Sequence, residues 1–201
     1  MTSAEEAAWL ATQRPSRVRE VQAGRLGWTE VDLLAVGDGD ATAIRGALEA
    51  FGVRVNYFPI GQARHIVAAL GGERSAAPYV VIACHGDEGA ILMDELAEEL
   101  AAFQPFNGNL GPAEVRTHLS FPGSVVIATG CDTGHEALAE AFLDAGAGAY
   151  VAPAHGPFGY ASVFAPLFLF YELTELRTLE EAVERLRAHD GELAMWRLAK
   201  R

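Results

Sequence analysis

Cys131 and His85 are the two residues of this sequence best placed to do covalent chemistry, because each directly follows an apolar run of strand length. The run over 124–130, SVVIATG, precedes Cys131, and the run over 78–84, PYVVIAC, precedes His85. A cysteine nucleophile needs a base within reach to take its proton. If the two runs form neighbouring parallel strands, the thiol and the imidazole meet at one edge of the sheet. The pair therefore predicts nucleophilic catalysis.

The surroundings of Cys131 favour a reactive thiol. Thr133 and Glu136 have the spacing of a capping box, which predicts a helix that begins at Gly134. Unpaired backbone N–H groups and the positive end of the helix dipole would then stabilise the thiolate. The core-facing apolar run has already ended at Ala128, which argues against a cysteine that only fills the core as a small apolar side chain. We interpret Cys131 as a nucleophile.

Two histidines are candidate bases for this thiol. His85 is followed by Gly86, which lets the backbone approach a substrate closely and whose N–H group is able to help bind an oxyanion. His155 and Gly156 repeat this pattern after the following strand, so the residues alone leave both histidines open. The other histidines lie in helical settings and are expected to be structural: His65, His118, His135 and His189. Because no two histidines or acids have the spacing of metal ligands, no metal site is expected.

Apolar runs alternate with helical patterns from residue 31 onward. Strands are expected over 31–36, 53–58, 78–84, 124–130 and 148–153, and helices over 41–52, 61–70, 134–145, 160–172 and 179–189. Strands that are apolar on both faces and alternate with helices predict a mostly parallel sheet with helices on both faces, which is a doubly wound α/β fold. Sites in such sheets form beyond the carboxyl ends of the strands, which is where Cys131 and His85 lie.

The chain is predicted to consist of an appendage and a single domain. Residues 1–30 form an N-terminal helical appendage, in which Ser3 and Glu6 have capping-box spacing and the helix ends before Pro15. Residues 31–201 form the α/β domain. Between its third and fourth predicted strands, EGAILM indicates a short hairpin strand and PAEVRTHL a short helix.

Composition excludes several classes of partner. The 201 residues include 27 acidic and 15 basic ones, for a net charge of −12. Such a chain lacks the clustered cations that nonspecific binding to DNA or RNA, or docking on an anionic membrane, requires. No apolar run reaches the ~20 residues of a membrane span. Two cysteines without a secretion signal predict free thiols and a cytoplasmic location.

Five segments resemble, in order, the caspase-like cysteine peptidase fold, and most nearly its CHAT domains. They are VVIACHGDEGAIL, LGPAEVRTHL, SVVIATGCDTG, ALAEAFLDAGAGAYVAP and FYELTELRTLEEAVERL, which cover most of residues 31–190. The resemblance implies a three-layer sandwich, a peptide or protein substrate, and neither a metal nor an organic cofactor. It also implies that Cys131 is the nucleophile, that His85 is the general base, and that the N–H groups of Gly86 and Cys131 form the oxyanion hole.

Two features depart from the pattern of that family. Gly130 stands where another small residue usually precedes the cysteine, and AHGPFGYA replaces a segment that usually contains a tryptophan. We assign Asp132 and His155 to substrate binding. By charge complementarity, Asp132, or with less support Glu88 or Asp87, would favour a basic substrate residue before the scissile bond.

Two other functions are alternatives. VVIACHG also resembles the nucleophile turn of class I amidotransferase-like enzymes, in which Cys84 would be the nucleophile with support from Asp38 or Asp40. The second alternative is a non-catalytic interaction domain of the same fold, with an amphipathic surface over 179–198. A protein partner or a homo-oligomer is compatible with each of these functions.

Overall fold

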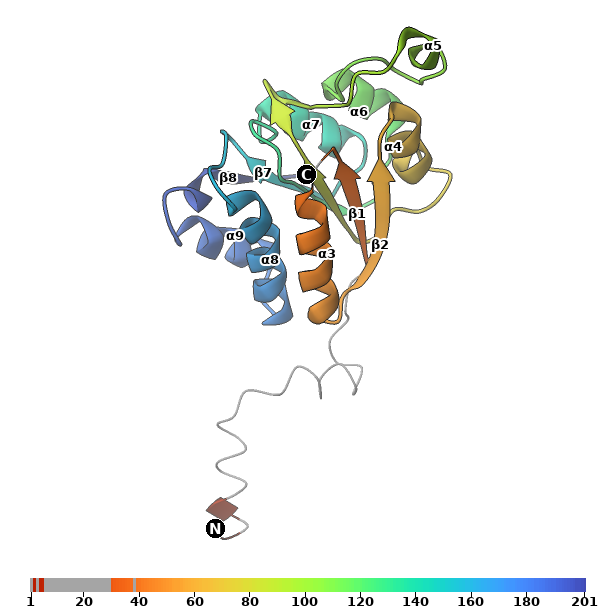
Figure 1. Ribbon diagram of the computed structural model, residues 1–201. Coiled ribbons are helices and arrows are strands. Elements are labelled where there is room, and N and C mark those ends of the chain that lie inside the picture. Colours follow the sequence, from red (N-terminus) through yellow and green to blue (C-terminus); the bar gives the residue numbers. More distant parts are fainter. Residues whose placement is uncertain (1, 3, 6–29, 38) are drawn as a thin grey trace.

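The computed structural model describes residues 2, 4–5, 30–37 and 39–201, and Figure 1 shows how their helices and strands are arranged. The appendage expected over residues 1–30, with its helix near Ser3, lies outside the described residues except for residues 2, 4, 5 and 30. None of the described helices is both long enough and apolar enough to cross a membrane.

The described domain is built on one six-stranded sheet with the strand order β2-β1-β3-β6-β7-β8. Its strands are β1 (Glu30–Val36), β2 (Arg54–Ile60), β3 (Tyr79–Cys84), β6 (Val125–Ala128), β7 (Ala149–Pro153) and β8 (Trp196–Lys200). All pairings in this sheet are parallel except that of β7 with β8, which is antiparallel. The prediction of an α/β fold with a mostly parallel sheet is therefore confirmed.

Helices cover both faces of this sheet, as the apolar strands require. One face packs against α3 (Asp40–Ala50), α8 (Ala161–Thr174) and α9 (Leu179–Arg187), and the other against α4 (Ala63–Leu70), α6 (Pro112–His118) and α7 (Glu136–Asp144). Figure 1 shows α3, α8 and α9 together on one side of the strands. Two apolar clusters result, one on each face, and the molecule has three layers.

The C-terminal segment forms a strand and not the expected helix. An amphipathic helical surface is expected over 179–198, whereas α9 ends at Arg187, a short 3-10 helix spans Leu193–Met195, and the chain then forms strand β8. Trp196, the first residue of β8, is fully buried between the sheet and its helices. Pairing with the edge of β7 and burial of this indole decide the structure of the segment.

The connection after β3 is the predicted hairpin. Strands β4 (Gly86–Asp87) and β5 (Ala90–Ile91) pair antiparallel, joined by Glu88 and Gly89, which both have positive φ angles, 46° and 77°. Two residues of this kind form the tight turn that suits the twist of a hairpin. The segment continues through α5 (Glu98–Ala101), a helix that sequence patterns did not predict, and α6, which they did.

The strand order decides which strand ends meet. The chain passes from β1 to β2 in one direction and then returns past β1 to β3, β6 and β7, so the order reverses beside β1. β3 and β6 are direct neighbours and run parallel, in the register Tyr79↔Val125 to Ile82↔Ala128. The condition set for the candidate pair, that these two strands are parallel neighbours, is therefore met. Their carboxyl ends lead into His85 and Thr129 at the same edge of the sheet.

Candidate active site

The segments that follow β3 and β6 are in direct contact through glycines. A Cβ atom on Gly86 would lie 2.3 Å from the carbonyl oxygen of Cys131 and 2.6 Å from Cγ2 of Thr133. A Cβ atom on Gly130 would lie 2.8 Å from the backbone nitrogen of Gly86 and 2.8 Å from the carbonyl carbon of His85. Real side chains do not tolerate such distances, so both positions require glycine. This gives a physical reason for Gly130, where the caspase-like pattern usually has another small residue.

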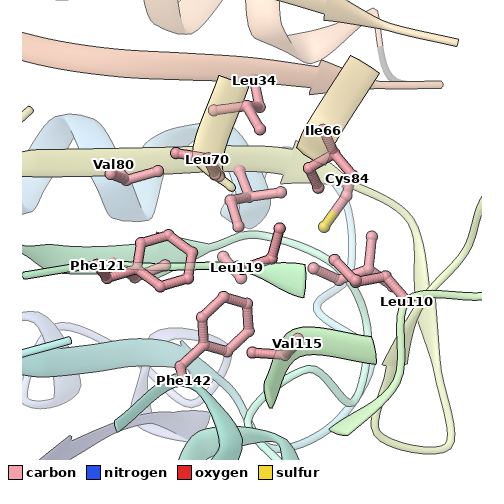
Figure 2. Close-up of a cluster of buried hydrophobic side chains, with 14 of the residues drawn as sticks. Leu34, Ile66, Leu70, Val80, Cys84, Leu110, Val115, Leu119, Phe121 and Phe142 are labelled. Atoms are coloured by element: carbon pink, nitrogen blue, oxygen red, sulfur yellow. The ribbon is translucent and has the colours of Figure 1, made fainter. Parts of the chain in front are cut away.

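Cys84 and His85 occupy different environments. Cys84 is 3% exposed and belongs to the apolar cluster under α4, α6 and α7. Figure 2 shows its sulfur pointing into this cluster, toward Leu110 and Leu119. His85 is exposed. Because successive side chains of an extended segment point to opposite sides, the burial of Cys84 leaves His85 on the side away from this cluster.

This arrangement gives little support to the alternative in which Cys84 is the nucleophile. A thiol enclosed by leucine and isoleucine side chains is closed to a substrate carbonyl. The nucleophile turn of an amidotransferase-like enzyme also enters a helix, whereas β3 is followed by the hairpin β4–β5. Of the two acids expected to assist Cys84, Asp38 lies outside the described residues, and Asp40 accepts a hydrogen bond from the Ser162 hydroxyl at 3.2 Å.

The prediction of a helix that begins at Gly134 is wrong. Helix α7 begins at Glu136, with His135 as its N-cap residue, and the Thr133 side chain caps no helix. Instead, the Thr133 hydroxyl donates to the carbonyl oxygen of Gly130 at 2.6 Å and closes a separate turn that contains Cys131. The thiol therefore lies a full turn ahead of the helix, and its reactivity has to come from this turn rather than from the α7 dipole.

The turn is held to β7 and to the segment that follows β7. The backbone N–H of Gly134 donates to the carbonyl of Pro153 at 2.7 Å, and that of Asp132 donates to the carbonyl of His155 at 3.4 Å. The hydroxyl of Tyr150, a residue of β7, donates to the carbonyl of Thr133 at 2.8 Å. Asp132 itself has a φ of 56°, in the left-handed region that L residues rarely adopt. Several independent contacts thus fix an unfavourable backbone conformation beside Cys131.

His155 also lies close to the candidate nucleophile. Its Nδ1 is 3.9 Å from Oδ1 of Asp132, and the two side chains are 76% and 39% exposed. A Cβ atom on the next residue, Gly156, would lie 3.4 Å from the Cys131 sulfur. The structure therefore brings the segments of both candidate bases, His85 and His155, to the half-buried Cys131. Among the described residues no hydrogen bond joins a histidine ring to this thiol.

Sequence patterns missed two aromatic residues at this edge. Phe158 and Tyr160, in the loop after His155, are 83% and 82% exposed. The backbone N–H of Phe158 donates to the Glu192 side chain at 2.9 Å, which ties this loop to the segment before β8. These two exposed aromatic side chains lie in the loop that follows Gly156, whose backbone is near the Cys131 sulfur, and such exposed apolar groups are candidates for a binding surface. The signal in the sequence was AHGPFGYA itself, a glycine-containing loop with two aromatic residues.

The described residues contain no group of three or more histidine, cysteine, aspartate and glutamate side chains arranged to hold a metal ion. Both cysteines are free thiols.

Comparisons with known proteins concern the fold. No family model and no curated protein matches the sequence. Two solved structures of the Saccharomyces cerevisiae separase–securin complex resemble the chain, one with a TM-score of 0.55 at 9% identity over 90% of this chain, the other with 0.54 at 10% identity over 85%. The chain spans only 13% and 12% of the lengths of the chains that it matches. At this identity the likeness shows the fold alone, which is the caspase-like three-layer α/β sandwich.

Proposed function

We propose that this chain is a cysteine endopeptidase of the caspase type, related most nearly to CHAT domains, with Cys131 as nucleophile and His85 as general base. The observation that supports this proposal best is the contact between the ends of β3 and β6. There the His85–Gly86 backbone packs directly on Gly130 and Cys131, as the missing Cβ atoms require. The burial of Cys84 on the opposite side of β3 leaves His85 as the exposed residue at this strand end.

In the proposed reaction, the Cys131 thiolate attacks the carbonyl carbon of a peptide bond, and the carbonyl π electrons move to its oxygen. The N–H groups of Gly86 and Cys131 would bind this oxyanion. His85 would give the proton taken from the thiol to the departing amine, and water would then hydrolyse the acyl-enzyme. We expect the imidazole and the thiol to close to hydrogen-bond distance when substrate binds, as catalytic pairs often do.

The surface around Cys131 suggests the kind of substrate. The half-exposed Asp132 carboxylate and the His155 ring would contact a polar or basic residue near the scissile bond. The exposed rings of Phe158 and Tyr160 would contact an apolar residue of the same extended peptide. Separase is solved in complex with securin, and we propose a protein partner for this chain too. Its free thiols suit a reducing cytoplasm.

Variants of the four candidate side chains test this proposal with a broad panel of fluorogenic peptides. We expect Cys131→Ala to abolish hydrolysis and to leave Tm within a few degrees, because the thiol lies at the sheet edge outside the apolar clusters. His85→Ala should lower kcat about a hundredfold or more. The matched variant Cys84→Ser should keep most of the activity per folded molecule, and His155→Ala should raise KM more than it lowers kcat.

Two outcomes would change the assignment. If His155→Ala and not His85→Ala removes activity, His155 is the base. If the wild-type chain cleaves no peptide in the panel, also after incubation with a lysate of its host, the non-catalytic interaction domain replaces the peptidase.

A further inference from the structure

A buried tyrosine on β7 lies directly beneath the turn that carries Cys131. Tyr150 is 1% exposed, and its ring stacks on Phe142 with centroids 4.5 Å apart and an interplanar angle of 11°. At the end of this fixed ring, its hydroxyl donates to the carbonyl oxygen of Thr133 at 2.8 Å. The sheet and α7 thus present one hydrogen-bond donor to the turn at a defined position.

The turn needs such support because its backbone is unfavourable. Asp132 has a φ of 56°, and a residue with a side chain keeps this conformation only where its surroundings impose it. Thr133 is at the centre of these surroundings. It is fully buried, its hydroxyl bonds the Gly130 carbonyl at 2.6 Å, and its carbonyl accepts the bond from Tyr150. One bond closes the turn internally and the other fixes it to the sheet.

The position of this turn is also tightly limited from the other side. The Cys131 carbonyl and the Thr133 methyl lie so close to Gly86 that a single added carbon atom would clash with both. A shift of the turn by a fraction of an ångström would therefore alter the contact between the segment of the candidate base and that of the candidate nucleophile.

The Tyr150 hydroxyl remains a donor under all ordinary conditions. Burial, with a smaller contribution from nearby Cys84, raises the pKa of Tyr150 well above its usual value, so the phenol keeps its proton. If the hydroxyl were removed, the buried Thr133 carbonyl would lose this partner, and the turn would have to move to find another.

We infer that Tyr150 is a positioning residue, whose hydroxyl holds the Thr133 carbonyl and through it keeps Cys131 in its strained turn against Gly86. The inference rests on the proposed function, in which Cys131 is the nucleophile. Tyr150 does not touch the substrate in this role and acts only through the turn.

The test is Tyr150→Phe, which removes one oxygen atom and keeps the stacked ring. The readouts are the rate constant for alkylation of Cys131 by iodoacetamide across neutral and mildly alkaline pH, measured by mass spectrometry, and kcat and KM for a cleaved peptide. We expect the alkylation rate and kcat to change by about three- to tenfold, which is roughly what one hydrogen bond contributes, with KM within about twofold. Tyr79→Phe, which removes a hydroxyl from β3 far from the turn, is the matched control and should match wild type.

A second variant guards against a folding defect. Thr133→Val removes the internal bond of the same turn, and the alkylation profile of Cys131 should shift in the same way. If Tyr150→Phe lowers Tm while the pH profile of Cys131 alkylation stays that of wild type, Tyr150 is only a core residue and the inference fails. If the profile shifts but no variant or wild type cleaves a peptide, the positioning role stands and the proposed peptidase function is what fails.

Discussion

Replacing Gly130 by alanine tests the central contact of the candidate site. A Cβ atom there would lie 2.8 Å from the Gly86 nitrogen, 2.8 Å from the His85 carbonyl carbon and 3.0 Å from the Cys84 sulfur. Two of these neighbours are backbone atoms, which cannot rotate away as a flexible side chain does. The segments after β3 and β6 must therefore separate by about half an ångström or more to reach ordinary contact distances.

The expected cost follows from this geometry. Overpacking by one methyl group in a rigid site costs about 1–3 kcal/mol of unfolding free energy. For a chain of this size, about 2 kcal/mol lowers Tm by roughly 4–8 °C. We expect the loss of peptidase activity to exceed what this destabilisation explains, because the separation falls between His85 and Cys131. Thermal unfolding measures Tm, urea titration the unfolding free energy, and hydrolysis of a fluorogenic peptide the activity. The rate of Cys131 alkylation reports separately on the thiol.

Two other glycines provide matched controls for this variant. Gly156→Ala places a Cβ atom at an ordinary distance of 3.4 Å from the Cys131 sulfur, so Tm should change by less than about 2 °C. Gly46→Ala, in helix α3 with nothing within 4 Å of the added atom, should stabilise the chain by up to about 1 kcal/mol. If Gly130→Ala melts and reacts as wild type does, the two segments do not pack as described, and the reasoning is refuted.

Two further predictions concern buried polar groups. Glu172→Gln removes the buried negative charge that pairs with Arg177 and Arg185, each of which lies 2.7 Å from the same carboxylate oxygen. We expect a loss of about 2 kcal/mol of unfolding free energy and a Tm several degrees lower, whereas the exposed control Glu184→Gln should stay within about 0.5 kcal/mol. The pKa of Tyr150 is raised in the folded state, so protonation of its phenol stabilises the fold. This contribution is fully present below the unfolded tyrosine pKa of about 10 and decreases as the pH rises above 10. Urea titrations should show the advantage of wild type over Tyr150→Phe shrinking by about 1.4 kcal/mol per pH unit in that range, and a constant difference would contradict this assignment.

Much of the fold could be predicted because it depends on local pattern. The strands beside the site are apolar on both faces, and such runs have few other ways to bury their side chains than the middle of a parallel sheet. EGAILM formed the expected hairpin because Glu88–Gly89 provides the tight turn. The candidate pair required β3 and β6 to be parallel neighbours, and the structure meets this condition. The candidate pair Cys131 and His85 follows from these strands and remains a proposal.

Strand β8 shows where local pattern fails. WRLAK lacks a sequence pattern typical of a strand. It forms strand β8 because its backbone pairs with the edge strand β7 and because the Trp196 side chain is buried there. Strand formation of this kind depends on neighbouring strands and side-chain burial more than on intrinsic preference. From the sequence alone, the residues between α9 and β8 are therefore taken as a continuation of the helix.

The start of α7 shows the same limit at the site itself. By itself, the sequence determined that a short polar segment with Cys131 follows a buried strand and precedes an amphipathic helix. Thr133 has the residue type and spacing of a helix cap, yet its hydroxyl donates to the Gly130 carbonyl. Strand β7 meanwhile provides a donor for the Thr133 carbonyl and an acceptor for the Gly134 N–H. Only the tertiary structure decided between these two uses of one hydroxyl, because bonds from β7 to the Thr133 carbonyl and the Gly134 N–H hold the turn apart from the helix, and β7 is distant in sequence and adjacent in space.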